Sequence, residues 1–197
     1  QWLYDKPKGK SMPLNVIIAI DLSGSMSGKP MNMARNAAME FVSKIDLNIH
    51  CVGIMGFADR SKMFSNLTHE ISSIESAINK LDCNASRVGY GNDNNPLGDT
   101  IDIFKYKEDS KNILIVLTDG VWSSQKQAIK SSDYCREVGY EVVAIGFGSA
   151  DKKFLERIST NSENALMTNL DNLVDSFGSI AQEISQSGGA SGLKWNK

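Results

Sequence analysis

Cysteine and histidine are scarce in this sequence, and the shortage limits the kinds of site that the chain can build. Only three cysteines, Cys51, Cys83 and Cys135, and two histidines occur among its 197 residues. The cysteines are odd in number, widely spaced and without a C-x-x-C pair, which fits neither a disulfide framework nor a zinc site. We therefore expect three free thiols and a cytoplasmic location.

A surplus of charge of one sign and long hydrophobic runs are also lacking. The 21 Lys and Arg residues nearly balance the 23 Asp and Glu residues, for a formal net charge of -2. A surface that binds nucleic acid needs an excess of clustered basic residues. The longest apolar stretches, such as residues 16–20 and 113–117, are far shorter than the roughly 20 residues that span a bilayer. We expect neither nucleic acid nor a membrane as a partner.

What is present is the composition of one ordinary globular domain. Hydrophobic residues make up 41% of the chain and charged residues 22%, with 16 Gly and 4 Pro, which is typical of a chain that folds around a core. We expect an N-terminal extension over residues 1–12, one domain over 13–184, and a flexible tail or linker over 185–197, where the run S-G-G-A-S-G occurs. We expect the chain to be monomeric by itself.

Hydrophobic patterns predict strands that alternate with helices. The expected strands span residues 15–20, 49–57, 62–67, 112–117, 141–147 and 165–168, and the expected helices span 30–45, 71–81, 97–106, 124–138, 151–158 and 170–184. This alternation predicts a doubly wound α/β domain, with a mostly parallel six-stranded sheet and helices on both faces. We expect the strand order 3-2-1-4-5-6, with the more polar segment 62–67 as an antiparallel edge strand.

Polar residues follow the two most apolar strands at the point where each strand ends. Asp21, Ser23 and Ser25 come directly after the first strand, and Asp119 follows the strand over 112–117. Because ligands of doubly wound sheets bind outside the carboxyl ends of the strands, we expect these side chains to lie close together. Carboxylate and hydroxyl oxygens are ligands that Mg²⁺ or Mn²⁺ prefers, whereas zinc prefers imidazole and thiolate. The pattern therefore predicts a site for Mg²⁺ or Mn²⁺.

Two of these motifs resemble those of the von Willebrand factor A (vWA) domain. The run D-L-S-G-S-M at residues 21–26 resembles the D-x-S-x-S signature of its metal-ion-dependent adhesion site (MIDAS), and T-D-G at residues 118–120 resembles the third loop of that site. The resemblance extends over about residues 13–184. It implies a divalent cation that is held at the strand ends and completed by a Glu or Asp carboxylate of a partner protein, with Asp119 orienting water.

One position departs from the pattern of the family. The second loop of the site commonly reads G-G-T-P-L-G-x-A, whereas residues 93–100 read D-N-N-P-L-G-D-T, so that Asn95 stands where Thr is usual. An Asn carbonyl oxygen is also a ligand for hard cations, so we expect Asn95 to substitute for the Thr, with Asp93 as the less favoured alternative. The expected metal ligands are thus Asp21, Ser23, Ser25, Asn95 and Asp119.

Several interpretations of these residues remain open. The Asp and Ser residues after the first strand could instead cap the next helix. The leading function is a non-enzymatic, cation-dependent protein-binding module. The alternative is a regulatory or scaffolding component of a bacterial stress-response or kinase- and phosphatase-linked system with a vestigial metal site, since the short form and residues 184–188 are similar to the bacterial tellurium-resistance group. A hydrolase has little support, because no general base is positioned near the expected ligands and His50 and His69 are expected to be structural.

Overall fold

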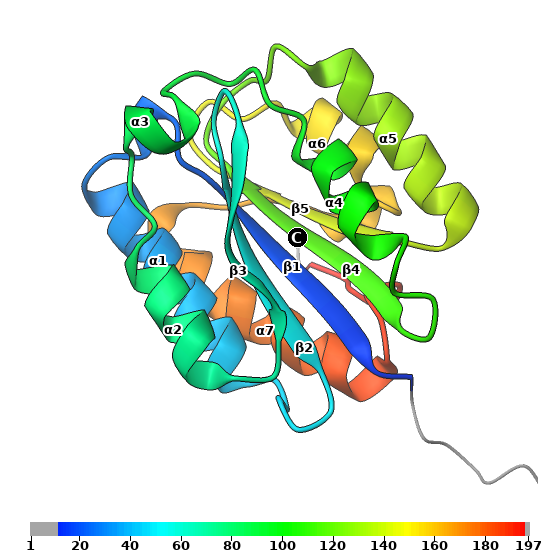
Figure 1. Cartoon of the computed structure of the whole chain (residues 1–197). Helices are drawn as coiled ribbons and strands as arrows, with labels where there is room; N and C mark the ends of the chain where they lie inside the picture. The colour runs from blue at the N-terminus through cyan, green and yellow to red at the C-terminus, as the bar shows by residue number, and fades with distance from the viewer. Residues whose placement is uncertain (1–11, 196–197) are drawn as a thin grey trace, which may run out of the picture.

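The computed structural model describes residues 12–195 of the chain and contains one twisted sheet between two layers of helices (Figure 1). The strands run in the order β3-β2-β1-β4-β5-β6, and only the β2–β3 pair is antiparallel. The strands are β1 (Leu14–Asp21), β2 (Cys51–Phe57), β3 (Ser61–Thr68), β4 (Lys111–Thr118), β5 (Glu141–Gly146) and β6 (Ala165–Met167). The predicted fold class, strand order and antiparallel edge are confirmed.

The helices also follow the predicted order, with small differences at their ends. They are α1 (Lys29–Ser43), α2 (Ile71–Asn79), α3 (Ala85–Val88), α4 (Pro96–Phe104), α5 (Gln125–Val138), α6 (Lys152–Ile158) and α7 (Leu173–Ser187), with short 3₁₀ turns η1 (Gly24–Met26), η2 (Ser162–Asn164) and η3 (Leu170–Asn172). Helix α3 lies between the expected helices over 71–81 and 97–106, where the sequence predicts neither a helix nor a strand. The predicted helix over 170–184 begins as η3 and continues as α7.

Strand β1 is buried along its whole length, as its continuous apolar run predicts. Alternate side chains point to opposite faces, so Val16, Ile18 and Ile20 pack with α1, α2 and α7, whereas Ile17 and Ala19 pack with α4, α5 and α6. Figure 1 shows these two helix layers on either side of the sheet. The core therefore holds β1 and β4 rigidly side by side and leaves their carboxyl ends at the rim.

The segment after α7 makes contacts with the domain that its Gly- and Ser-rich composition does not predict. Helix α7 extends to Ser187, and Ala190 beyond it is fully buried. The Ala190 N–H donates to the Glu141 carboxylate, which also pairs with Lys111 at 2.5 Å, and the Ala190 carbonyl accepts a 2.8 Å hydrogen bond from Asn164 Nδ2. The Gly- and Ser-rich composition suggests a linker, but both backbone groups of Ala190 have partners in the domain. Residues 1–11 of the predicted N-terminal extension lie outside the described residues.

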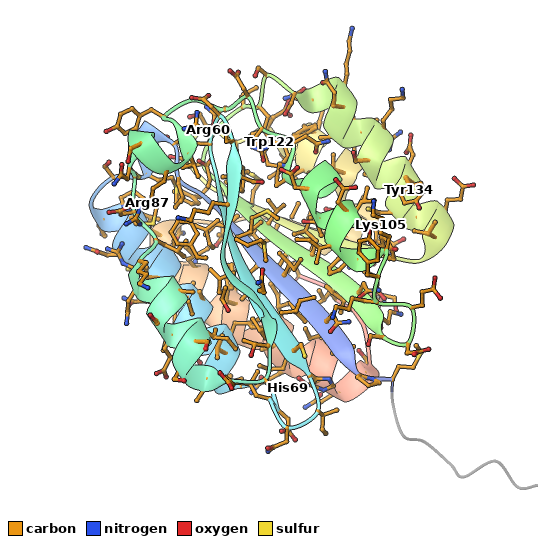
Figure 2. All side chains as sticks on the ribbon, viewed as in Figure 1. Arg60, His69, Arg87, Lys105, Trp122 and Tyr134 are labelled. Carbon is orange, nitrogen blue, oxygen red and sulfur yellow. The ribbon has the colours of Figure 1, made fainter. Side chains whose placement is uncertain are left out.

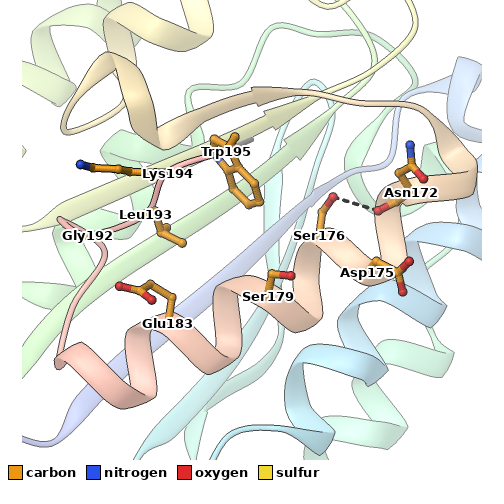
Figure 3. A pocket seen from close by; sticks show the side chains of 9 residues that line it. All are labelled: Asn172, Asp175, Ser176, Ser179, Glu183, Gly192, Leu193, Lys194 and Trp195. Carbon is orange, nitrogen blue, oxygen red and sulfur yellow. Dashed lines mark hydrogen bonds between the residues drawn. The ribbon is translucent and has the colours of Figure 1, made fainter. Parts of the chain in front are cut away.

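A pocket of about 620 Å³ lies between α7 and the segment that follows it. Figure 3 shows Leu193 and Trp195 on one side and Ser179 and Glu183 of α7 on the other. Leu193 is buried, and Trp195 is partly buried. The returning segment thus runs beside α7 and packs against the same core cluster.

Within residues 12–195, none of the helices combines the length and the hydrophobicity that crossing a bilayer requires.

We predict that Gly56→Ala destabilises the domain. A Cβ on Gly56 would lie 2.8 Å from Phe64 Cε2 and 3.1 Å from Leu22 Cγ, which is closer than side chains pack. We expect a loss of about 1–3 kcal/mol in the free energy of unfolding, measured by urea denaturation. The control is Gly24→Ala, whose Cβ would meet Tyr90 Cδ1 at an ordinary 3.9 Å. Equal stabilities of the two variants would show that the side chains around Gly56 can accommodate a Cβ without loss of stability.

Candidate metal centre

The parallel pairing of β1 with β4 brings two polar loops together at one edge of the sheet. Ile20 pairs with Leu117, so that Asp21, the last residue of β1, lies beside Thr118, the last residue of β4. Asp119 follows immediately. The two loops that the sequence singles out therefore begin at neighbouring strand ends, as predicted from the topology.

The Asp21 carboxylate is fully buried and held by hydrogen bonds at both oxygens. Its Oδ1 accepts a 2.8 Å bond from the Ser23 backbone N–H, and its Oδ2 accepts a 2.7 Å bond from Thr118 Oγ1. The first bond closes a tight local turn that a short acidic side chain can form with the backbone two residues ahead. Both bonds fix the direction in which this carboxylate points.

A chain of hydroxyl groups joins the first loop, which follows β1, to Asp119 in the loop after β4. Ser25 Oγ donates to Asp119 Oδ1 at 2.9 Å, and Ser23 Oγ lies 3.2 Å from Ser25 Oγ. A hydroxyl has only one hydrogen, so the bond to Asp119 leaves the Ser25 oxygen as an acceptor toward Ser23. Four of the five predicted ligands, Asp21, Ser23, Ser25 and Asp119, are thus brought into one cluster.

This cluster buries its two carboxylates, whereas Ser25 is exposed at its surface. Burial raises the pKa of Asp21, hydrogen bonds from Ser23 and Thr118 oppose that rise, and the nearby charge of Asp119 adds to it. Asp119 is itself only 7% exposed. Two buried acidic groups that share one site favour a bound cation, because a positive charge offsets both the desolvation and the repulsion.

The ligand chemistry of the cluster fits a hard divalent cation. Among residues 12–195, no three His, Cys, Asp or Glu side chains gather into a group that could hold a metal. Any cation at this edge would therefore depend on hydroxyl and carbonyl oxygens in addition to the two carboxylates. Mg²⁺ and Mn²⁺ accept such oxygens together with water.

Thr118 is a site residue whose role the sequence did not reveal. Its fully buried hydroxyl donates to Asp21 and accepts a 3.0 Å hydrogen bond from Trp122 Nε1. Trp122 in turn packs edge-on against Phe57 and Phe154 at ring-centroid distances of 5.4 and 5.3 Å, and Figure 2 shows it near the carboxyl-end edge of the sheet. The sequence signal that could have indicated this role is the position of Thr118, a hydroxyl residue, directly before Asp119.

The two candidate residues of the second loop do not join this hydrogen-bond network. Asn95 precedes α4, and its Nδ2 donates to Ser131 Oγ on α5 at 2.9 Å. Asp93 Oδ1 accepts a 2.5 Å bond from Ser123 Oγ. The other four predicted ligands are therefore connected with one another, and the position that departs from the family pattern is turned toward a helix.

Unpartnered oxygens nevertheless line the second loop. The Oδ1 atoms of Asn92, Asn94 and Asn95 are buried and have no hydrogen-bond partner among the described residues. The Asn92 carboxamide lies 3.7 Å from the place of a Cβ on Gly120, beside Asp119. Buried carbonyl oxygens without partners are uncommon and call for a water or an ion. Asn92 is thus better placed than Asn95 to face the cluster.

The alternative that these residues only cap a helix has little support in the hydrogen bonds. Helix α1 is preceded by Gly28, and no side chain caps its first turn. Ser23 precedes η1 without a side-chain capping bond. The polar side chains of the first loop are directed toward one another and toward β4.

Backbone hydrogen bonds hold the three loops together. The Gly24 N–H donates to the Tyr90 carbonyl at 3.0 Å, which connects the first loop to the second. The Ser123 N–H donates to the Asn92 carbonyl at 3.1 Å, which connects the second loop to the third. The second loop is therefore bonded to both of the other loops.

Comparison with known proteins places this geometry in context. The chain is 26% identical over 179 residues to the human collagen alpha-5(VI) chain, covering 86% of this chain but only 7% of that one. The vWF domain of the type V pili tip protein Mfa5 from Porphyromonas gingivalis has a TM-score of 0.78 at 13% identity and covers 96% of this chain and 99% of its own. Proximal thread matrix protein 1 from the mussel byssus, with a zinc-occupied MIDAS motif, has a TM-score of 0.72 at 22% identity and covers 89% of this chain and 46% of its own.

A family model decides the assignment, since structural likeness at such low identity shows the fold alone. The model of the von Willebrand factor type A domain matches residues 15–183, which is most of the chain and includes all of the sheet except Leu14, together with all three loops. The chain belongs to the von Willebrand factor type A domain family.

Proposed function

We propose that this chain is a cation-dependent protein-binding module and not an enzyme. The observation that carries the proposal is the hydrogen-bonded cluster of Asp21, Ser23, Ser25 and Asp119, in which the Ser25–Asp119 bond of 2.9 Å joins two loops at one edge of the sheet. Membership of a family often used for protein–protein interaction supports the same conclusion. The zinc-occupied motif of the mussel protein supports a cation at the corresponding place.

Each residue of the cluster has a distinct task in this proposal. Asp21, Ser23 and Ser25 contribute oxygen ligands directly or through water, and Asp119 adds negative charge and orients water. Thr118 holds the Asp21 carboxylate in place through its 2.7 Å hydrogen bond. When bound, Mg²⁺ or Mn²⁺ would supply a positive charge, and a Glu or Asp carboxylate of the partner would complete the coordination of the ion.

Exposed apolar side chains beside the cluster support a protein as the partner. Tyr90 on the second loop is 58% exposed and Val121 on the third loop is 53% exposed. The backbone of Tyr90 contacts Gly24 of the first loop. These aromatic and aliphatic side chains can pack against the part of a partner's surface that surrounds its acidic residue.

The position of the histidines supports a binding role over a catalytic one. His50 precedes β2 and His69 follows β3, which places both at the edge of the sheet opposite to Asp21. Neither imidazole can therefore serve as a general base for a water molecule near the cluster. A hydrolase would have to use the cation ligands themselves as bases.

A second candidate function is regulatory or scaffolding, with a weakened cation site. It is favoured by the hydrogen bond of Asn95 to Ser131, which occupies the residue that stands in the place of the usual Thr. In this case the partner would bind the loops without a cation. Cytoplasmic location, bacterial origin, the tellurium-resistance group and a monomeric state stay predictions from the sequence.

We predict that Asp21→Asn abolishes binding of Mg²⁺ and Mn²⁺. The variant keeps the shape of the side chain but removes a charge that the ion needs, so the affinity should fall at least about 100-fold in isothermal titration calorimetry. The control is Asp102→Asn, which removes the same charge from an exposed side chain of α4 paired with Lys105. Equal affinities of wild type and Asp21→Asn would reject the proposed site.

We predict that Asn92→Ala weakens cation binding more than Asn95→Ala does. The Asn92 carboxamide lies beside the Asp119–Gly120 turn, whereas the Asn95 amide contacts α5. Loss of one neutral ligand should lower the affinity by about tenfold. A larger effect of Asn95→Ala in the same titrations would restore Asn95 as the ligand of the second loop.

We predict that partner capture depends on the cation. Affinity capture from the source cells should lose its partner when EDTA is added, and excess Mg²⁺ should restore it, because the partner carboxylate has no other counter-charge in the cluster. Asp21→Asn should capture no partner in either condition. Capture that resists EDTA and persists in Asp21→Asn would favour the scaffolding function.

A further inference from the structure

A thiol and an imidazole meet at the edge of the sheet that lies opposite to the metal cluster. Cys51 begins β2, and His69 directly follows β3, the antiparallel neighbour of β2. Figure 2 shows His69 at the far end of the sheet from Trp122. The seven-residue strand β2 runs from Cys51 to Phe57, the partner of Asp21, and spans about 20 Å at the rise of an extended strand. The pair is therefore separate from the proposed cation site.

The hydrogen bonds of His69 determine which of its nitrogens carries the hydrogen. Nδ1 lies 2.8 Å from the Leu47 carbonyl oxygen and 3.0 Å from the His50 carbonyl oxygen. Carbonyl oxygens only accept hydrogen bonds, so Nδ1 is the donor. In the neutral imidazole the lone pair then belongs to Nε2, which lies 3.2 Å from Cys51 Sγ. The thiol hydrogen of Cys51 therefore points to a basic nitrogen.

The surroundings leave this pair accessible and the Cys51 thiol protonated at rest. Cys51 is partly exposed and His69 is exposed. Burial raises the pKa of the Cys51 thiol, and the positive charge of Lys107 opposes that rise. The thiol thus needs a base to become a nucleophile, and His69 Nε2 is within hydrogen-bonding distance. A nucleophile, a base and a group that orients the base are the parts of an activated thiol.

The other two cysteines lack this arrangement and provide internal controls. Cys83 Sγ donates to the Ser23 carbonyl oxygen at 3.2 Å, so its hydrogen is directed to an oxygen that is not basic. Cys135 is only 3% exposed, and burial raises the pKa of its thiol to about 11. Both should react slowly with reagents in solution.

We propose that Cys51 is a reactive thiol, activated by His69, that forms mixed disulfides with small disulfide-containing molecules. The Cys51 thiol gives its proton to His69 Nε2, and the sulfur attacks one sulfur of the external disulfide. The new S–S bond forms as the old one breaks, and the departing thiolate takes the proton from the imidazolium. One disulfide and one thiol are consumed, and one mixed disulfide and one thiol are formed, so no further oxidant is needed.

The test measures the rate of thiol exchange in the full chain. The probe is 2,2′-dithiodipyridine, a neutral disulfide, so that the charge of Lys107 does not attract it. Its release of thiopyridone is followed by absorbance, and mass spectrometry identifies the modified cysteine. The variants are Cys51→Ser, Cys83→Ser, Cys135→Ser and His69→Gln, the last of which keeps a polar side chain but removes the basic nitrogen.

We expect the fastest phase to belong to Cys51, to disappear in Cys51→Ser and to persist in Cys83→Ser and Cys135→Ser. His69→Gln should slow it at least about tenfold at neutral pH, because general-base assistance is lost. Added free imidazole should restore part of the rate in His69→Gln, which a purely structural role of His69 would not allow. Thermal unfolding checks that each variant is folded. An unchanged Cys51 rate in a folded His69→Gln variant, or faster reaction of Cys83 or Cys135, would overturn the proposal.

Discussion

Parallel pairing of β1 with β4 is the constraint on which the candidate site depends. The pairing places Asp21 beside Thr118, and the 2.7 Å hydrogen bond between their side chains ties the two strand ends together. Burial of β1 on both faces prevents either strand end from moving independently. The core thus determines the positions of the two strand ends, and the loop after β1 directs the Ser25 hydroxyl toward Asp119.

The cluster buries two carboxylates, and burial of a charged group costs free energy that cation binding would offset. A domain that needed only stability would not bury Asp21 completely beside a second acid. Desolvation raises the pKa of Asp21, and the hydrogen bonds from Ser23 and Thr118 offset only part of the cost. A site of this kind favours cations, because the charge that destabilises it when empty stabilises the ion when bound.

Much of the fold and the centre of the site could be predicted from the sequence, because both depend on local patterns. The apolar runs before Asp21 and Asp119 indicate buried parallel strands, and parallel strands end at the same edge. The orientation of Asn95 could not be predicted, since its partner Ser131 lies on another helix. The contacts of Ala190 could not be predicted for a similar reason, since its partners Glu141 and Asn164 lie far from it in the sequence.

Trp122 has a consequence for how this domain can be observed. Its indole N–H is bonded to Thr118, whose hydroxyl is bonded to the Asp21 carboxylate. A change in the electric field at that carboxylate is therefore transmitted to the indole through two hydrogen bonds. The emission wavelength of an indole responds to such fields, so the fluorescence of Trp122 should change when a cation binds beside Asp21.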